Sequence, residues 1–159
     1  MTRALGLDLG ERRIGVAIAE EDGASARPLT TLRRAKAIDG DAETLRQLIE
    51  THGIDELVVG LPLEAAGQEG VQAAVTRAWI RTISGILGEG ITITMHDERL
   101  SSHLAENRLG PMKRGRSGGP PSRTQRDAYR ARVDREAAAI ILQDELDSRR
   151  PARSAGSNP

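Results

Sequence analysis

A very short connection near the start of the chain constrains the fold more than any other feature of the sequence. Residues 10–13, which include Glu11-Arg12-Arg13, separate an apolar run at 4–9 from a second one at 14–19. A link of this length cannot make a parallel crossover, so the two runs predict an antiparallel hairpin. Residues 28–32 follow as a third, edge-like strand. The chain is therefore expected to open with an antiparallel meander.

Helical and strand-like segments then alternate along the rest of the chain. Asp41 is predicted to cap a helix that ends at Gly53. Continuous apolar residues at 57–61 indicate a strand buried on both faces, which is typical of a parallel sheet. Further segments are a helix at 69–87, a strand at 91–95, a helix from Ser101 or Ser102 to Arg108, and a last helix at 124–146. A meander followed by these units predicts an α/β three-layer fold with a mixed five-stranded sheet flanked by helices.

The composition restricts the classes of function. The 159 residues include no cysteine, which excludes a disulfide framework, zinc–thiolate sites and cysteine nucleophiles. No apolar run approaches the roughly 18 residues of a membrane span, and the first residues lack the layout of a signal peptide. We expect a cytoplasmic protein with no membrane partner. Its single domain is expected to cover 1–146, and 147–159 to form a disordered tail.

The zero formal net charge hides an uneven distribution along the sequence. Residues 107–132 carry eight basic residues and one acid, whereas residues 1–106 carry 11 basic and 17 acidic residues. Arginine makes up 21 of the 23 basic residues, and its planar fork suits phosphate. The glycines and prolines at 109–124 predict a flexible basic loop. A nucleic-acid partner is one interpretation of this segment, and a solvated loop is the other. The residues expected to bind nucleic acid here are Lys113, Arg114, Arg116, Arg123, Arg126 and Arg130.

Three acidic residues occupy positions where apolar residues would be expected. Asp8 lies inside an apolar strand, Glu98 follows the end of another strand, and Asp134 borders the buried face of the last helix. Charged groups are seldom buried unless they are paired or coordinate a metal. Three such carboxylates would repel each other unless a positive group lay between them. Hard divalent cations such as magnesium and manganese accept carboxylate oxygens, and a pair of such ions can promote phosphodiester hydrolysis.

Ordinary ion pairs are the alternative interpretation of the same acids. Each has an arginine near it in sequence, so each could simply be neutralised by that neighbour. The pairs would be Asp8 with Arg13, Glu98 with Arg99, and Asp134 with Arg130. The residues alone leave the choice between a metal site and three ion pairs open.

Several short motifs, taken in order, resemble the YqgF/RuvX family. They are GLDLG at 6–10, RIGVA at 13–17, VVGLPL at 58–63, DERLSS at 97–102, and a final helix with Val133-Asp134 followed by alanines and isoleucines. Members of that family are described as Holliday junction resolvases and pre-16S ribosomal RNA nucleases. The resemblance covers essentially residues 3–146. It implies a ribonuclease H-like fold in which Asp8, Glu98 and Asp134 bind magnesium or manganese and catalyse phosphodiester hydrolysis.

The resemblance also bears on the substrate and on two further arginines. The implied reaction either trims the 5′ end of a small-subunit rRNA precursor or cuts branched DNA, with Arg13 and Arg99 contacting the nucleic acid. One motif departs from the family: after GLPL the usual pattern is asparagine, a hydrophobic residue, aspartate and glycine, whereas this chain has EAAG at 64–67. Any substrate contact made by the usual polar pair is therefore in doubt.

Two rival functions are compatible with parts of the sequence. An actin-like or sugar-kinase ATPase also carries Asp-Leu-Gly on its first strand, but that fold needs two such domains and 159 residues are too few. A non-catalytic nucleic-acid-binding factor in ribosome assembly or transcription would need the arginines but not all three acids. The motifs do not distinguish RNA from DNA. Two-fold cleavage of a junction would require a homodimer, for which the sequence identifies no face.

Overall fold

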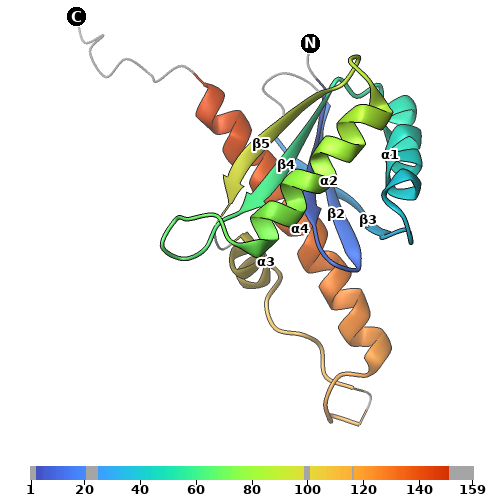
Figure 1. Ribbon diagram of the computed structural model, residues 1–159. Helices are drawn as coiled ribbons and strands as arrows, with labels where there is room; N and C mark the ends of the chain where they lie inside the picture. The colour runs from blue at the N-terminus through green and yellow to red at the C-terminus, as the bar shows by residue number, and fades with distance from the viewer. Residues whose placement is uncertain (1–2, 21–24, 99–100, 116, 151–159) are drawn as a thin grey trace, which may run out of the picture.

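A mixed five-stranded sheet forms the centre of the protein (Figure 1). The computed structural model describes residues 3–20, 25–98, 101–115 and 117–150. The strands are β1 (Ala4–Leu9), β2 (Arg13–Ala19), β3 (Arg27–Arg33), β4 (Glu56–Pro62) and β5 (Thr92–Glu98), in the spatial order β3-β2-β1-β4-β5. β1, β2 and β3 pair antiparallel, and β1, β4 and β5 pair parallel. The predicted meander and mixed sheet are confirmed.

Helices cover both faces of this sheet. Apolar residues that alternate along the strands divide into two sets, because successive side chains of a strand point to opposite faces. One set, which includes Leu5, Leu7 and Val59, packs against α1 (Ile38–His52) and α2 (Val71–Leu87). The other, which includes Ala17 and Val58, packs against α4 (Arg123–Arg149). The short helix α3 (Ser101–Leu109) packs on α4 rather than on the sheet.

Glycines allow α4 to lie unusually close to the central strands. A Cβ atom on Gly15 of β2 would come within 1.9 Å of the Asp134 carbonyl oxygen. A Cβ on Gly6 of β1 would meet the Ala138 carbonyl oxygen at 2.7 Å. Separations of this size are far shorter than van der Waals contact, so only glycine fits at either position. These two residues set the depth at which α4, and Asp134 with it, rests on the sheet.

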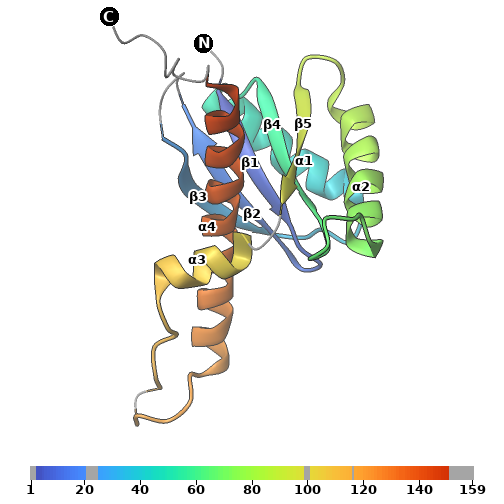
Figure 2. The same cartoon turned by 90° about the vertical axis from the view of Figure 1, so that its left-hand side faces the viewer.

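The amino-terminal half of α4 extends beyond the sheet. Figure 2 shows this half projecting past the edge at which β1, β4 and β5 end, with α3 packed beside it and the described parts of the connection, 110–115 and 117–122, at the far end. The helix starts with a capping box, in which Ser122 and Gln125 each accept a hydrogen bond from the other's backbone N–H. The basic segment predicted from the sequence therefore lies on an arm rather than over the sheet.

Several boundaries differ from those expected: α2 begins at Val71 rather than 69, and β5 continues to Glu98 rather than ending at 95. α1 begins at Ile38, so Asp41 lies within the helix instead of capping it. The Asp41 carboxylate is buried and accepts hydrogen bonds from Arg34, the Ala35 backbone N–H and the Trp79 indole. The last helix continues through Arg149, past the end at 146 that the sequence predicted. The remainder of the expected tail, 151–159, falls outside the described residues.

Membrane insertion finds no support in the helices of the described ranges. None of them combines the length and the apolar character that a membrane-crossing helix requires.

Candidate active site

The three candidate acids lie on the same face of the sheet. Asp8 follows Gly6 by two residues on β1, and Gly6 contacts α4, so Asp8 also faces α4. Glu98 is the last residue of β5 and is two residues from His96, whose ring contacts Glu145 of α4. The close contact at Gly15, the residue paired with Asp8, places Asp134 of α4 over that same region. Strand alternation and the position of α4 thus place all three acids in one region of that face.

The environment of Asp8 penalises its negative charge. Burial, followed by the nearby charges of Asp134 and Glu98, raises the pKa of Asp8 from 3.8 to about 7. Within the described ranges no side chain or backbone N–H donates a hydrogen bond to its carboxylate. A bound cation would therefore stabilise the ionised form of the Asp8 carboxylate.

The other two acids have protein partners. Asp134 Oδ2 accepts a hydrogen bond from Arg13 Nε at 2.6 Å, and both side chains are only about one quarter exposed. Glu98 Oε1 accepts from the Ser101 backbone N–H at 2.6 Å and from the Ser101 hydroxyl, and thereby holds the start of α3. The alternative interpretation, which paired Asp8 with Arg13 and Asp134 with Arg130, is wrong in both pairs, because Arg13 binds Asp134 instead. Arg13 and Gly15 share a face of β2, which aims Arg13 at α4.

The donor chemistry of these residues fits a divalent cation such as magnesium or manganese. Three carboxylates offer the hard oxygen ligands that such ions prefer, and Asp8 has no hydrogen-bond donor in the described structure to compete with an ion. In the arrangement seen here, no three acidic or histidine side chains of the described ranges stand close enough together to hold one ion. Coordination by all three would require Asp134 or Glu98 to turn away from its present partner.

The residues predicted to bind nucleic acid are distributed over three places. Arg13 lies beside the acids, as described above. Arg123, Arg126 and Arg130 lie on the projecting half of α4, whereas Lys113 and Arg114 lie in the connection at its tip (Figure 2). Arg99 and Arg116 fall outside the described residues. The sequence thus identified an arm of basic residues that starts near the acids and leads away from them.

The loop that departs from the family motif lies next to one of the acids. The Leu63 backbone N–H donates to the Glu98 carbonyl oxygen at 3.0 Å, so the turn after β4 begins beside Glu98. Glu64 itself accepts a hydrogen bond from Gln68 at 3.1 Å and is exposed. Its carboxylate is thereby held within the loop.

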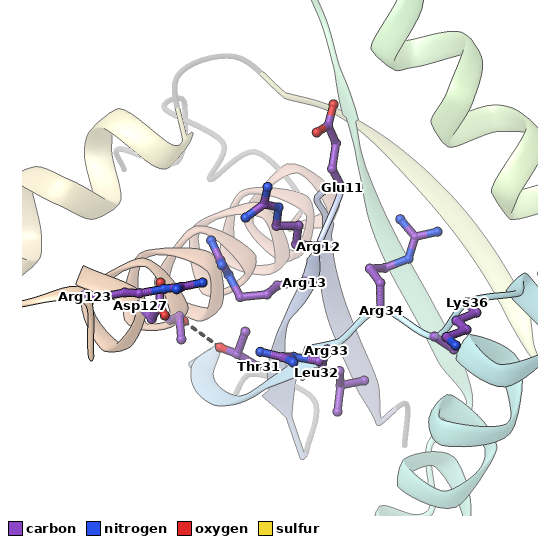
Figure 3. Close-up of a pocket in the computed structure, with 12 residues that line it drawn as sticks. Glu11, Arg12, Arg13, Thr31, Leu32, Arg33, Arg34, Lys36, Arg123 and Asp127 are labelled. Atoms are coloured by element: carbon purple, nitrogen blue, oxygen red, sulfur yellow. Dashed lines mark hydrogen bonds between the residues drawn. The ribbon is translucent and has the colours of Figure 1, made fainter. Parts of the chain in front are cut away.

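The sequence reasoning missed a basic pocket beside the acids. This pocket, of about 640 Å³, lies between the ends of β2 and β3 on one side and α4 on the other (Figure 3). Six basic residues line it: Arg12, Arg13, Arg33, Arg34, Lys36 and Arg123. Only Arg13 and Arg123 belong to the predicted set. The others occur in a part of the sequence whose net charge is negative. The adjacent pairs Arg12-Arg13 and Arg33-Arg34, at the two ends of the predicted hairpin of the second and third strands, could have indicated the pocket.

Comparison with known proteins gives the family. A model of the RuvX family, described as "Holliday junction resolvase", matches residues 2–148. A Chloroflexus aurantiacus protein named "Putative pre-16S rRNA nuclease" is 41% identical over 152 residues, which cover 94% of this chain and 91% of that protein. A protein of the same name from Anaeromyxobacter dehalogenans is also 41% identical and is covered to 99%.

A solved structure supports the fold. The RuvC protein of T. thermophilus, in complex with a Holliday junction substrate, aligns over 93% of this chain and 96% of that chain with a TM-score of 0.50. The identity is 13%, so this likeness concerns the fold alone. Together with the matched family model and the two relatives, it confirms the predicted ribonuclease H-like, three-layer architecture, and the chain belongs to the RuvX (YqgF) family of nucleases.

Proposed function

We propose that this protein is a metal-dependent nuclease that hydrolyses phosphodiester bonds with Asp8, Glu98 and Asp134 as its catalytic acids. The raised pKa of Asp8 carries the proposal, because its causes include the charges of the other two acids. A cluster that makes one of its own carboxylates difficult to ionise is costly to keep, and function is a common reason for such a cost. A divalent cation bound there would neutralise the acids and help to activate water for attack on phosphorus.

The residues of the chain have distinct roles in this proposal. Asp8, fixed on a central strand, would be the least mobile ligand. Glu98 and Asp134 would each exchange a protein contact for the cation, and Arg13 would then be free to turn from Asp134 toward a phosphate of the substrate. A guanidinium is well suited to that exchange, because it binds carboxylate and phosphate with the same planar fork.

The substrate that we favour is the 5′ region of pre-16S rRNA, in ribosome biogenesis in the cytoplasm, with Holliday junctions as the second candidate. The names of the relatives support the first, and the description of the family model supports the second. Cleavage of both arms of a junction would in addition require a homodimer, because the two scissile bonds are related by two-fold symmetry.

A specific contact favours the alternative function, a non-catalytic nucleic-acid-binding factor. The Arg13–Asp134 ion pair neutralises one of the three acids without any metal. If that pair persisted in the presence of substrate and cation, the arginines alone would account for binding.

The deciding experiment measures cleavage of a pre-16S rRNA fragment and of a four-way DNA junction, with manganese, with magnesium and with EDTA. We expect the wild type to cut one of them only when the metal is present. The substitution Asp8→Asn should reduce the rate by at least about 100-fold, because it removes a ligand that the cluster cannot replace. Asp144→Asn, an exposed aspartate on α4, is the matched control and should cut normally.

Two results would contradict the proposal. Cleavage by Asp8→Asn at the wild-type rate would remove Asp8 from the mechanism. Tight binding of both substrates without cleavage under any metal condition would establish the binding factor instead.

A further inference from the structure

We propose that the basic pocket between β2, β3 and α4 is a binding site for the sugar–phosphate backbone of the nucleic-acid substrate, next to the cluster of acids. The inference rests on the proposed function and deepens it, because it assigns a path to the substrate strand. Arg12, Arg33, Lys36 and Arg123 are the residues assigned to hold the phosphates. Three of these four lie outside the basic segment of the sequence.

The pocket concentrates positive charge that the described part of the protein does not neutralise. Of its six basic residues, Arg13 pairs with Asp134 and Arg34 pairs with the buried Asp41. The remaining four form no ion pair with any carboxylate of the described ranges. Only two acids, Glu11 and Asp127, line the same pocket.

The register of the sheet brings two of the pocket arginines opposite each other. Arg13 of β2 and Arg33 of β3 are directly opposite each other in the antiparallel pair, so their side chains share the face that α4 covers. Like charges at such a position destabilise a sheet. Asp134 relieves the repulsion for Arg13, and an anion in the pocket would relieve it for Arg33.

The arginines of the strands and of α4 face a common space. In Figure 3 the side chains of Arg12, Arg13 and Arg33 extend toward the part of α4 that carries Arg123, so four guanidinium groups face one space from two sides. The two sides are tied together, because the Thr31 hydroxyl donates to the Ala131 carbonyl oxygen at 2.5 Å. The site is therefore built from elements that are held in place, rather than from a loop.

The lining of the pocket favours one class of ligand. The residues that line the pocket include no aromatic side chain, so it offers no surface on which a base could stack. Guanidinium groups without a stacking partner recognise phosphates rather than bases. Arg13 belongs to both the pocket and the ion pair with Asp134, so a strand bound here would continue directly to the acids.

The test compares two charge-matched double variants in an Asp8→Asn background, with EDTA present so that the probes stay intact. Arg12→Gln/Arg33→Gln removes two charges from the pocket. Arg46→Gln/Arg81→Gln removes two from α1 and α2, on the opposite face of the sheet. Binding of a pre-16S rRNA fragment and of a four-way DNA junction is measured from 50 to 200 mM salt, with 10 mM inorganic phosphate as a competitor in a separate arm.

We expect the pocket variant to bind the preferred probe roughly tenfold more weakly and to lower the slope of log K against log salt by about 1.4 to 1.8, the effect of two lost phosphate contacts. The control variant should change the slope by less than about 0.5. Inorganic phosphate should compete weakly, because it occupies one contact at a time. Equal slopes for the two variants would overturn the inference, as would binding of neither probe by the parent protein.

A second measurement leaves every charge in place. Because the chain has no cysteine, Ala35→Cys at the rim of the pocket and Ala78→Cys on α2 can each carry a photoactivatable cross-linker. We expect cross-links at one defined position of the strand from residue 35 and background levels from residue 78. Cross-linking that is equal from both, or scattered along the strand, would contradict the inference.

The failures of the two proposals are distinguishable. If the wild type cuts with metal but the pocket variant binds normally, the strand takes another path and only this inference fails. If the pocket variant loses binding while no condition produces cleavage, the pocket is a backbone site of a binding factor and only the nuclease proposal fails.

Discussion

Asp8 is the residue whose protonation couples the site to the stability of the fold. It lies on a strand whose neighbours are apolar, and the fold adds two more negative charges beside it. The sequence alone indicates Asp8 as unusual, because a charged residue within a buried strand needs a reason. The hydrogen-bond partner of Asp134 could not be predicted in the same way, because that partner, Arg13, is 121 residues away in the sequence.

The raised pKa leads to a prediction for the metal-free protein. The folded state holds the Asp8 proton up to about pH 7, whereas the unfolded chain releases it near pH 3.8. The free energy of unfolding must therefore fall as the pH rises between these values, and the penalty is complete above pH 7. Asp8→Asn removes it. Because the carboxyl is partly exposed and solvent screens it, we expect Asp8→Asn to be more stable by about 1–3 kcal/mol at pH 8.

Urea denaturation in EDTA at pH 4.5 and at pH 8 would check this prediction. The gain should be largest at pH 8 and several-fold smaller at pH 4.5, where the unfolded chain is only partly ionised at this carboxyl, and Asp144→Asn should show no comparable dependence. A gain of the same size at both values would mean that packing, and not charge, is responsible.

At the scale of elements, the position of α4 on the sheet decides how near Asp134 lies to Asp8. Apolar periodicity predicts that the helix is amphipathic, but not how deeply it lies. That depth depends on Gly15 and Gly6, whose missing side chains leave room for the helix backbone. At the start of α1, a local sequence signal was misleading. Asp41 resembles an N-cap residue, but its carboxylate accepts hydrogen bonds from Arg34 and Trp79 in the interior. These tertiary hydrogen bonds outweigh the local preference for capping.

The substitution Gly15→Ala tests the importance of this contact. The new methyl group would come within 1.9 Å of the Asp134 carbonyl oxygen, so the helix backbone must move away. We expect a loss of about 3 kcal/mol, at the upper end of the cost of overpacking, together with loss of cleavage under conditions where the variant is still folded. Thermal denaturation and the cleavage assay measure the two effects separately.

Gly85→Ala is the matched control for that substitution. Gly85 lies within α2, and a Cβ there would meet nothing within 4 Å. Alanine should stabilise the protein by up to about 1 kcal/mol, because it is the better helix former. Equal stability of the two variants would show that the contact between β2 and α4 is more adaptable than the distances indicate.

At the scale of the whole molecule, the two ends of α4 have different tasks. Its amino-terminal half carries arginines beyond the sheet, and its carboxyl-terminal end is tied to β4. Arg149 donates two hydrogen bonds to Glu56, at 2.8 and 2.6 Å, and Thr94 donates a third at 2.5 Å. The last turn of the helix thus packs against the sheet, although the sequence predicted that a disordered tail begins at residue 147.

The pair of Arg149 and Glu56 predicts a dependence on pH. The hydrogen bonds from Arg149 lower the pKa of Glu56 below its usual 4.5. Their contribution to stability is therefore complete above pH 4.5 and is lost as the pH falls through the lowered pKa. We expect Arg149→Gln to cost about 1–2 kcal/mol at pH 7, because the arginine is partly exposed, and progressively less in acid.

Chemical denaturation of this variant at pH 7 and below pH 4 would measure the effect. Arg150→Gln serves as the control, because Arg150 only approaches Asp147 at 3.8 Å and both side chains are exposed. Its cost should stay below about 0.5 kcal/mol at both values. A cost of Arg149→Gln that does not change with pH would place its role in packing rather than in the ion pair.

The sequence by itself determined the order and type of the elements, since apolar periodicity and a short connection act locally. It also determined which three acids stand out, because a charge in an apolar segment is visible without a fold. Only the tertiary structure decided which charges meet: Arg13 with Asp134, Arg149 with Glu56, and Arg33 opposite Arg13. Electrostatic contacts depend on distance in space, which strand register and helix seating set. A net charge summed along the sequence therefore revealed the basic arm but concealed the basic pocket.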